Sequence, residues 1–158
     1  MTTFKELNLD TNIQKGIDDI GYTECTDVQS QTFKETFDGK DVLVQSQTGT
    51  GKTGAFLISI FQQLAKDASK KALILAPTRE LALQINENAI ALNKHLNHHI
   101  VSIVGGVSYT KQLKALEKKP DLLIATPGRV IDLNNSNKVN FKDFSVLVID
   151  EADRLLEM

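Results

Sequence analysis

Two stretches of this sequence contain residue types that could handle a polyphosphate. Residues 46–53 read SQTGTGKT, and residues 150–153 read DEAD directly after the apolar run VLVI. Glycine lets a turn direct backbone N–H groups toward an anion, and a lysine and a hydroxyl group beside it can bind phosphate and Mg²⁺. A pair of carboxylates can bind the same metal and accept a proton from water. Together the two stretches indicate chemistry on a nucleoside triphosphate.

The first stretch, which we call the phosphate loop (residues 46–53), lies between the apolar run DVLVQ and the amphipathic segment GAFLISIFQQLAK. A phosphate loop requires such a place between a strand and a helix. Lys52 is expected to reach the terminal phosphates, and Thr53 to ligate Mg²⁺. The general pattern GxxxxGK[ST] has glycine where this chain has Ser46, and a plain glycine-rich turn before a helix is the alternative. The predicted nucleotide contacts in the loop are Ser46, Gln47, Thr48, Gly49, Thr50, Gly51, Lys52 and Thr53.

The second stretch would supply the acids of the reaction. Asp150 is expected to bind Mg²⁺ together with Thr53, and Glu151 to orient the attacking water and take its proton. With Lys52 they form the predicted catalytic set. Adjacent side chains of a strand point to opposite sides, so the strand must end at this pair for both acids to serve one site. The alternative is a solvated acidic turn in which Asp150 or Asp153 caps a helix.

Three further motifs accompany these two: PTRELA at residues 77–82, GG at residues 105–106 and TPGR at residues 126–129. In this order and spacing the five motifs resemble those of the DEAD-box ATP-dependent RNA helicases, over nearly the whole chain. That family has serine or alanine at the position of Ser46. The resemblance implies the N-terminal RecA-like domain of an RNA-dependent ATPase, with ATP and Mg²⁺ as cofactors.

The resemblance also implies contacts with the sugar-phosphate backbone of single-stranded or duplex RNA. Exposed backbone amides, a hydroxyl group and two arginines suit such contacts, which touch no base edge and are therefore independent of sequence. Taken alone, PTRELA would leave Arg79 and Glu80 as solvated charges in the first turn of a helix. The implied RNA-binding residues are Pro77, Thr78, Arg79, Gly105, Gly106, Thr126, Pro127, Gly128 and Arg129.

Upstream, Phe4 and the stretch GYTECTDVQ at residues 21–29 match the family's isolated phenylalanine and its GFxxPTxxQ-like segment, with Cys25 in place of the usual proline. The amide of Gln29 offers a donor beside an acceptor, which complements N6 and N7 of adenine. Phe4 could stack on the base and Tyr22 could pack nearby. The alternative is that Gln29 starts a surface helix and Phe4 is an ordinary core residue.

Bulk composition bounds these interpretations. The chain has 158 residues, with 18 Lys plus Arg against 20 Asp plus Glu, so nucleic-acid binding must be local. The single cysteine and the polar N-terminus favour a reducing, cytoplasmic location, and the apolar runs are too short to span a membrane. His95, His98 and His99 complete no recognisable zinc spacing.

The elements that must position these residues alternate along the chain. Strands are predicted at residues 41–46, 72–77, 99–106, 121–126 and 144–150, and helices at 54–66, 79–96, 109–118 and 127–135, after a helical N-terminal region. This alternation predicts an α/β fold with a mostly parallel sheet and helices on both faces. In terms of the resemblance, it is a RecA-like P-loop NTPase fold that is incomplete at its C-terminal end. The ligand crevice is expected at the carboxyl ends of the strands.

The predicted organisation is an N-terminal helical Q-motif region, residues 1–38, followed by RecA-like domain 1, residues 39–158. In the family, a SAT motif that pairs with Asp153 and a second RecA-like domain follow. The SAT strand lies between the strands that precede the phosphate loop and DEAD, so a gap is expected there. Rearrangement, or strand exchange between copies, could fill it. We expect an ATP-binding half of an RNA helicase that is weakly active by itself. A non-catalytic RNA- or protein-binding module and a DNA-remodelling ATPase remain as alternatives.

Overall fold

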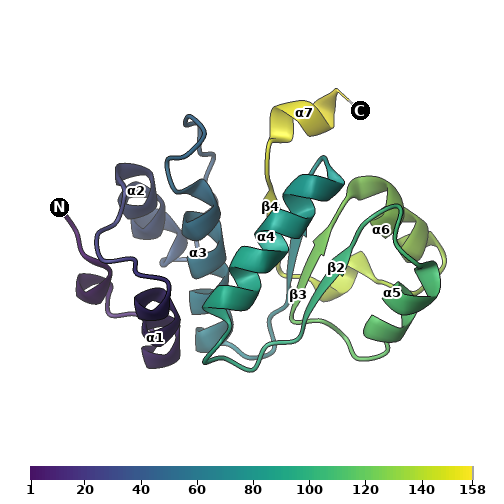
Figure 1. Ribbon diagram of the computed structural model, residues 1–158, viewed down its shortest axis with the longest axis horizontal. Coiled ribbons are helices and arrows are strands. Elements are labelled where there is room, and N and C mark those ends of the chain that lie inside the picture. Colours follow the sequence, from purple (N-terminus) through teal and green to yellow (C-terminus); the bar gives the residue numbers. More distant parts are fainter. Residues whose placement is uncertain (158) are drawn as a thin grey trace. The chain divides into compact units, whose positions relative to one another are not determined.

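Four parallel strands form the sheet in the computed structural model, which describes residues 1–157 (Figure 1). Their order across the sheet is β2-β3-β1-β4. Each strand pairs in full register with its neighbours, so that Leu73 of β1 lies beside Leu123 of β3 and Leu147 of β4. The strands are β1 (Ala72–Leu75), β2 (Ile100–Ile103), β3 (Leu122–Ala125) and β4 (Val146–Ile149).

Helices cover both faces of this sheet. The chain passes from β1 through α4 (Arg79–Leu92) to β2 in one direction across the sheet. It returns in the other direction through α5 (Tyr109–Ala115) to β3 and through α6 (Pro127–Asn135) to β4. Because parallel crossovers are right-handed, α4 lies on one face and α5 and α6 on the opposite face. The predicted α/β class with helices on both faces is therefore confirmed.

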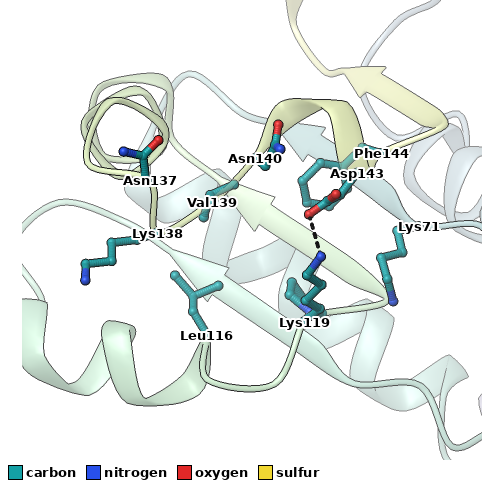
Figure 2. Close-up of a pocket in the computed structure, with 10 residues that line it drawn as sticks. Lys71, Leu116, Lys119, Asn137, Lys138, Val139, Asn140, Asp143 and Phe144 are labelled. Carbon is teal, nitrogen blue, oxygen red and sulfur yellow. Dashed lines mark ion pairs between the residues drawn. The ribbon is translucent and has the colours of Figure 1, made fainter.

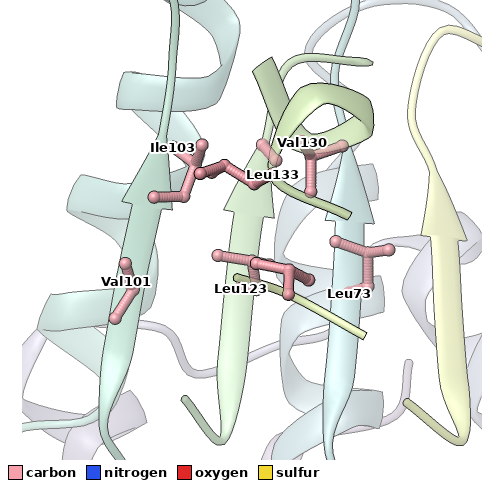
Figure 3. Close-up of a cluster of buried hydrophobic side chains, with 8 residues drawn as sticks. Leu73, Val101, Ile103, Leu123, Val130 and Leu133 are labelled. Atoms are coloured by element: carbon pink, nitrogen blue, oxygen red, sulfur yellow. The ribbon is translucent and has the colours of Figure 1, made fainter. Parts of the chain in front are cut away.

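The core under α5 and α6 is built from alternate residues of three strands, as a sheet with a period of two requires (Figure 3). Val130 and Leu133 of α6 pack onto it, and Leu113 and Leu116 are partly buried against it. The strand residues in this cluster are Leu73, Val101, Ile103, Leu123 and Ala125. This core holds the start of α6 at the carboxyl end of β3.

The chain divides into two compact units, which differ from the domains predicted with a boundary after residue 38. Unit 1 comprises Met1–Ser69 and Asn88–Asn97, and unit 2 comprises Lys70–Glu87 and the residues from His98 onward. The sheet lies wholly in unit 2. Unit 1 contains helices η1 (Phe4–Leu7), α1 (Thr11–Asp19), α2 (Asp27–Thr36) and α3 (Lys52–Lys66), with the end of α4.

Unit 1 depends on one close approach between helices. A Cβ at Gly16 of α1 would lie 2.7 Å from the carbonyl oxygen of Leu92. Backbone cannot yield as a flexible side chain can, so glycine is required there. Ile13 and Ile17, on either side of Gly16, are fully buried. The N-terminal helical region predicted from the sequence is confirmed.

The predicted strand at residues 41–46 is absent, and its prediction as a buried strand is wrong. The segment has no regular structure, and the side chains of Val42, Leu43 and Val44 are 42%, 95% and 38% exposed. A parallel strand is stable only where neighbouring strands satisfy its N–H and C=O groups and helices cover its faces. Among the described residues, the sheet ends at β4 with no further strand. The sheet therefore has four strands where five were predicted.

Strand β4, at the edge of the sheet, is a formed strand whose apolar side chains remain exposed. Leu147 and Ile149 of β4 lie in register with Leu73 and Leu75, on the face covered by α5 and α6. They are nevertheless 58% and 48% exposed. After β4 only the short helix α7 (Ala152–Leu156) is described, and a short 3₁₀ helix, η2 (Phe141–Asp143), precedes β4. Within the described residues, the β4 edge of the sheet therefore leaves apolar side chains uncovered.

Within residues 1–157, no helix combines the length and apolar character needed to cross a membrane.

Candidate functional site

The phosphate loop begins helix α3 through two glycines in the left-handed region. Gly49 has φ of 83° and Gly51, the N-cap residue, has φ of 88°. No side chain caps the helix, so the first N–H groups of α3 are not satisfied by a cap. An uncapped N-terminus of a 15-residue helix favours an anion through its N–H groups and its dipole. The start of α3 and the positive φ of the two glycines agree with the predicted loop, whereas the strand predicted before it is absent.

Lys52 is held inside the loop. Its Nζ donates to the carbonyl oxygen of Ser46 at 3.0 Å. The hydroxyl of Thr50 donates to the carbonyl of Gln47 at 2.8 Å, so the hydroxyl of Ser46, 2.8 Å away, must be the donor in its bond with Thr50. The loop thus closes on its own polar groups, and Lys52 would exchange a carbonyl oxygen for a phosphate oxygen. Thr53, the second residue of α3, is half-buried, whereas Gln47 and Thr48 are exposed.

Gln29 joins helix α2 to this loop. Its Oε1 accepts from the Thr26 N–H at 3.0 Å, while Thr26 Oγ1 accepts from the Gln29 N–H, which completes a capping box. Its Nε2 donates to the carbonyl of Gly51 at 3.1 Å. A Cβ at Gly51 would lie 2.6 Å from that Nε2, so glycine is needed for the contact as well as for the backbone angle. Gln29 is buried in the first turn of α2, and its role at a base stays a prediction.

Phe4 occupies the core of unit 1. It is 1% exposed, and its ring stacks on Tyr22 at 6.1 Å between centroids and meets Phe33 edge-on at 6.3 Å. This placement agrees with the alternative of an ordinary core residue. Tyr22 is 45% exposed, so it is the ring of this pair that faces solvent. Stacking of Phe4 on a base stays a prediction.

Cys25, which stands where the family has proline, donates its backbone N–H to the carbonyl of Thr2 at 2.9 Å. Proline has no N–H and could not make this bond. One residue away, Thr3 and Glu24 form an antiparallel bridge. The side chain of Cys25 is buried, and burial raises the pKa of its thiol, with a smaller contribution from Glu6. The departure from the family pattern therefore adds a bond that holds the segment containing Phe4.

The two acids lie where strand β4 ends. Asp150 donates its N–H to the carbonyl of Leu75, and its Oδ1 accepts from the Glu151 N–H at 3.0 Å. Glu151 has φ of 50°, an unfavourable angle for a residue with a side chain, and ion-pairs with Arg154 at 3.0 Å. The N-cap residue of α7 is Glu151, so the interpretation of Asp150 or Asp153 as the cap is wrong. Asp153 lies exposed on α7.

Two of the predicted RNA motifs meet beside the sheet. Helix α4 starts at Arg79, and Thr78 Oγ1 accepts from the Leu81 N–H at 3.2 Å, which caps the helix. A Cβ at Gly106, where φ is 78°, would lie 2.8 Å from a terminal nitrogen of Arg79. Arg79 is exposed, as a solvated first-turn charge would be, yet its guanidinium lies against the GG turn.

The third RNA motif joins the same region through Arg129. Its NH1 donates to the carbonyl of Val107 at 3.3 Å and to Oε1 of Gln112 at 2.8 Å, and its guanidinium lies 5.5 Å from the ring centre of Tyr109. At the start of α6, Thr126 gives no side-chain cap and Pro127 occupies the first turn, while Gly128 and Gly105 are exposed. All three motifs therefore gather at the carboxyl ends of β1, β2 and β3.

Sequence patterns did not single out Gln112 and Tyr109, because residues 109–118 were predicted only as a helix. Gln112 is 4% exposed and its Nε2 donates to the carbonyl of Val104 at 2.8 Å. A polar residue on the apolar side of an amphipathic helix is the one signal that could have identified it.

The residues predicted to bind nucleotide through the loop and the base belong to one compact unit, and those predicted to bind RNA belong to the other. Phe4, Tyr22, Gln29 and the phosphate loop all belong to unit 1. The RNA motifs belong to unit 2, together with Asp150, Glu151 and Asp153.

A pocket of about 230 Å³ lies at the amino ends of the strands, opposite the carboxyl ends at which the RNA motifs gather (Figure 2). Lys71, Pro120 and Phe144 line it just before β1, β3 and β4. Two of its lysines are already paired, Lys119 with Asp143 at 3.3 Å and Lys71 with Asp121 at 3.4 Å. None of the predicted site residues lines this pocket.

The histidines serve surface contacts. His95 Nε2 lies 2.6 Å from a carboxylate oxygen of Asp19, and His99 Nε2 lies 3.0 Å from the carbonyl of Ala115. In the described part of the chain, no group of three or more histidine, cysteine or acidic side chains could hold a metal ion.

Comparison with known proteins decides the family. Residues 26–158 match the DEAD/DEAH box helicase family. The chain belongs to this family. A DEAD/DEAH box helicase domain agrees with the phosphate loop at the start of α3, the acids after β4 and the three motifs beside the sheet.

The curated relatives are named as RNA helicases, and they align with nearly the whole of this chain. It is 45% identical to the ATP-dependent RNA helicase RhlB of Pseudomonas putida, with 99% of this chain and 42% of that protein aligned. It is 37% identical to the DEAD-box ATP-dependent RNA helicase CshA of Bacillus cereus, with 100% and 30% aligned. The chain thus spans less than half the length of either relative.

A solved structure confirms the fold of this DEAD-box domain. The crystal structure of a hypothetical ATP-dependent RNA helicase from Sulfolobus tokodaii matches with a TM-score of 0.87 and 32% identity. The match covers 95% of this chain and 44% of that one. The sheet with its helices is therefore the RecA-like fold of an RNA helicase domain.

Proposed function

We propose that this chain is the ATP-binding half of an enzyme that couples ATP binding and hydrolysis to unwinding of RNA duplexes or remodelling of RNA–protein complexes. The observation that carries the proposal is the uncapped N-terminus of α3, where Lys52 is held by a backbone carbonyl until a phosphate replaces it. Family membership and relatives that are ATP-dependent RNA helicases support it.

The residues present fit a nucleotide with Mg²⁺. The phosphate loop offers glycines at positive φ, an uncapped helix and a lysine, and Thr53 and Asp150 are hard oxygen ligands of the kind that Mg²⁺ prefers. The bound metal would neutralise the charge that develops on the transferred phosphoryl group. Glu151 would orient the attacking water and accept its proton, for which it must leave Arg154.

RNA binding is proposed for the three motifs of unit 2. Arg79 and Arg129 bring two positive charges to one region, and Gly106 allows close approach of a ligand to the backbone. The start of α6 adds uncapped N–H groups. These groups address phosphates and not base edges, so we expect binding that is independent of sequence and sensitive to salt.

The partners of this half are proposed on the same basis. A second RecA-like domain would complete the ATP site, so residues 1–158 by themselves should hydrolyse ATP poorly. The exposed apolar segment 41–46 and the open edge of β4 favour strand exchange between copies. The buried free thiol of Cys25 suits a reducing, cytoplasmic compartment.

Titration of the chain with Mg²⁺ and a non-hydrolysable ATP analogue by calorimetry tests the proposal. We expect weak binding to the wild type and at least a tenfold loss in Lys52→Ala. Glu151→Gln is the control, because it should keep binding and lose the residual hydrolysis. A wild type that binds no nucleotide, together with RNA binding that ignores nucleotide, would instead favour a non-catalytic RNA-binding module. A longer chain stimulated equally by DNA and RNA would favour a DNA-remodelling ATPase.

A further inference from the structure

We propose that Gln112 is a positioning residue that, with Tyr109, fixes the guanidinium of Arg129 so that one particular edge of it is presented to an RNA phosphate. This inference rests on the proposed RNA binding at unit 2 and adds residues outside the motifs. Gln112 lies on α5, 17 positions before Arg129, and its side chain makes a hydrogen bond with Arg129 at 2.8 Å.

The two hydrogen bonds of Gln112 determine the orientation of its amide. Nε2 donates to the carbonyl of Val104 at 2.8 Å, and Oε1 accepts from Arg129. A flipped amide would place its oxygen against a carbonyl oxygen and its NH₂ against a cation, so only one orientation satisfies both partners. Because Gln112 is 4% exposed, water cannot readily replace either bond. Glutamine is therefore the side chain whose chemistry fits both contacts.

These contacts leave a defined part of Arg129 for a ligand. NH1 carries two hydrogens, and its bonds to Val107 and Gln112 use both of them. The opposite edge, formed by Nε and NH2, has the parallel donors that bind a phosphate in a bidentate manner. Tyr109 lies under the guanidinium at 5.5 Å and favours its charge through a cation–π contact. Arg129 is thus held from one edge and one face.

The same side chain joins two of the RNA motifs. Val104, whose carbonyl accepts from Gln112, directly precedes the GG turn at Gly105, and Arg129 ends the TPGR motif. Loss of the Gln112 amide would therefore free Arg129 and leave a buried carbonyl beside the turn unsatisfied. An arginine with free rotamers must be ordered on binding, which weakens its contact with phosphate.

Binding of a fluorescein-labelled oligouridylate to the chain, measured by anisotropy at several salt concentrations, tests the inference. Gln112→Met keeps the length and burial of the side chain and removes the amide. We expect it to weaken binding about fivefold to tenfold, because the effect reaches RNA only through Arg129 and should match the loss of one ordinary hydrogen bond. Thr110→Ala, an exposed change on the same helix, is the matched control and should leave binding unchanged.

A double-mutant cycle separates positioning from a general effect on the fold. In an Arg129→Ala background, Gln112→Met should cause no further loss of RNA affinity, because it acts through the missing arginine. An equal loss in both backgrounds would overturn the inference. Unaltered RNA binding in Arg129→Ala would instead count against the proposed function at this motif.

A second measurement does not need RNA. The Nε–H signal of Arg129 in nitrogen-15 NMR spectra should be narrow in the wild type and broadened by rotamer exchange in Gln112→Met. If that variant does not fold, Tyr109→Leu, at a residue 41% exposed, should broaden the same signal and weaken RNA binding about twofold. An unchanged Arg129 signal in a folded variant would overturn the positioning role.

Discussion

At the scale of single residues, Gly105 and Gly106 stand side by side in one motif but have different structural roles. Gly106 has φ of 78°, and a Cβ there would meet the guanidinium of Arg79 at 2.8 Å, whereas a Cβ at Gly105 would meet nothing within 4 Å. In the sequence these are two adjacent glycines, and nothing local distinguishes their roles. The backbone angle and the neighbouring arginine, which distinguish them, come from the turn that follows β2.

Alanine at each glycine provides a matched pair. Gly106→Ala should lower the free energy of unfolding by about 1 kcal/mol, because alanine is strained at that angle. It should also weaken RNA binding, since Arg79 must move. Gly105→Ala, with ordinary φ and open space, should change neither quantity measurably. Urea unfolding and anisotropy with an oligouridylate measure the two effects, and equal behaviour of the two variants would contradict the assignment.

Asp121 is a second residue whose environment the sequence does not reveal. Burial raises its pKa, but the hydrogen bond from the His99 N–H at 2.8 Å and the charge and hydrogen bond of Lys71 outweigh burial, with His98 contributing. The net result is a pKa below the ordinary value of 3.8. A carboxyl with a depressed pKa in the folded state stabilises the fold above its unfolded pKa, and this stability is lost as the pH falls through the folded value.

Asp121→Asn should therefore destabilise the chain by about 1 kcal/mol at neutral pH, because the amide keeps an oxygen but loses the charge beside Lys71. The difference from the wild type should shrink as the pH falls below about 4, because the carboxyl of the unfolded chain becomes protonated there and that of the folded chain only at lower pH. Thermal unfolding between pH 3 and pH 7 measures this. A difference that stays constant across the range would show that the charge contributes nothing.

At the scale of elements, β4 and residues 41–46 are two apolar segments that lack the neighbours such segments usually have. Both have the composition of buried strands, and the sequence predicted both as strands. Only β4 forms, because β1 offers it a full set of backbone partners. Local preference alone does not make a strand, since its hydrogen bonds are made with other segments.

The open face of β4 should promote self-association. Leu147→Thr removes an apolar side chain that is 58% exposed, so it should change stability by less than about 0.5 kcal/mol and lower the apparent mass at high concentration. Leu73→Thr, at the register partner that is 5% exposed, is the control and should cost about 3 kcal/mol. Light scattering and urea unfolding measure these quantities. An apparent mass that Leu147→Thr leaves unchanged would exclude this face as the cause of association.

At the scale of the whole molecule, the two compact units divide the chemistry between them. The phosphate loop and Gln29 belong to unit 1, and the RNA motifs and the acids Asp150 and Glu151 belong to unit 2. Hydrolysis as proposed needs Lys52 and Glu151 at one nucleotide. Each ligand should therefore protect backbone amides from hydrogen exchange mainly in the unit that binds it.

Hydrogen exchange followed by mass spectrometry tests this division. A nucleotide without RNA should protect residues 46–53 and 26–29 from exchange. The reason is that binding orders the N-terminus of α3 and the hydrogen bond from Gln29 to Gly51. An oligouridylate without nucleotide should protect residues 77–79, 105–106 and 126–129. Lys52→Ala should abolish the first pattern and keep the second. Protection of the phosphate loop by RNA alone would contradict the division.

The sequence by itself determined the identity of the motifs, the class of fold and, apart from the strand wrongly predicted at residues 41–46, the order of elements. These follow from residue types at fixed spacing: periodic apolar residues, glycines before a helix, and acids after a strand. Tertiary structure decided the rest, because it depends on which segments meet. It placed Arg79 against Gly106, gave Gln112 its two partners, put Phe4 in a core and left residues 41–46 without a sheet. Hydrogen bonds between strands and the burial of side chains are made by residues far apart in the chain, and no local pattern contains them.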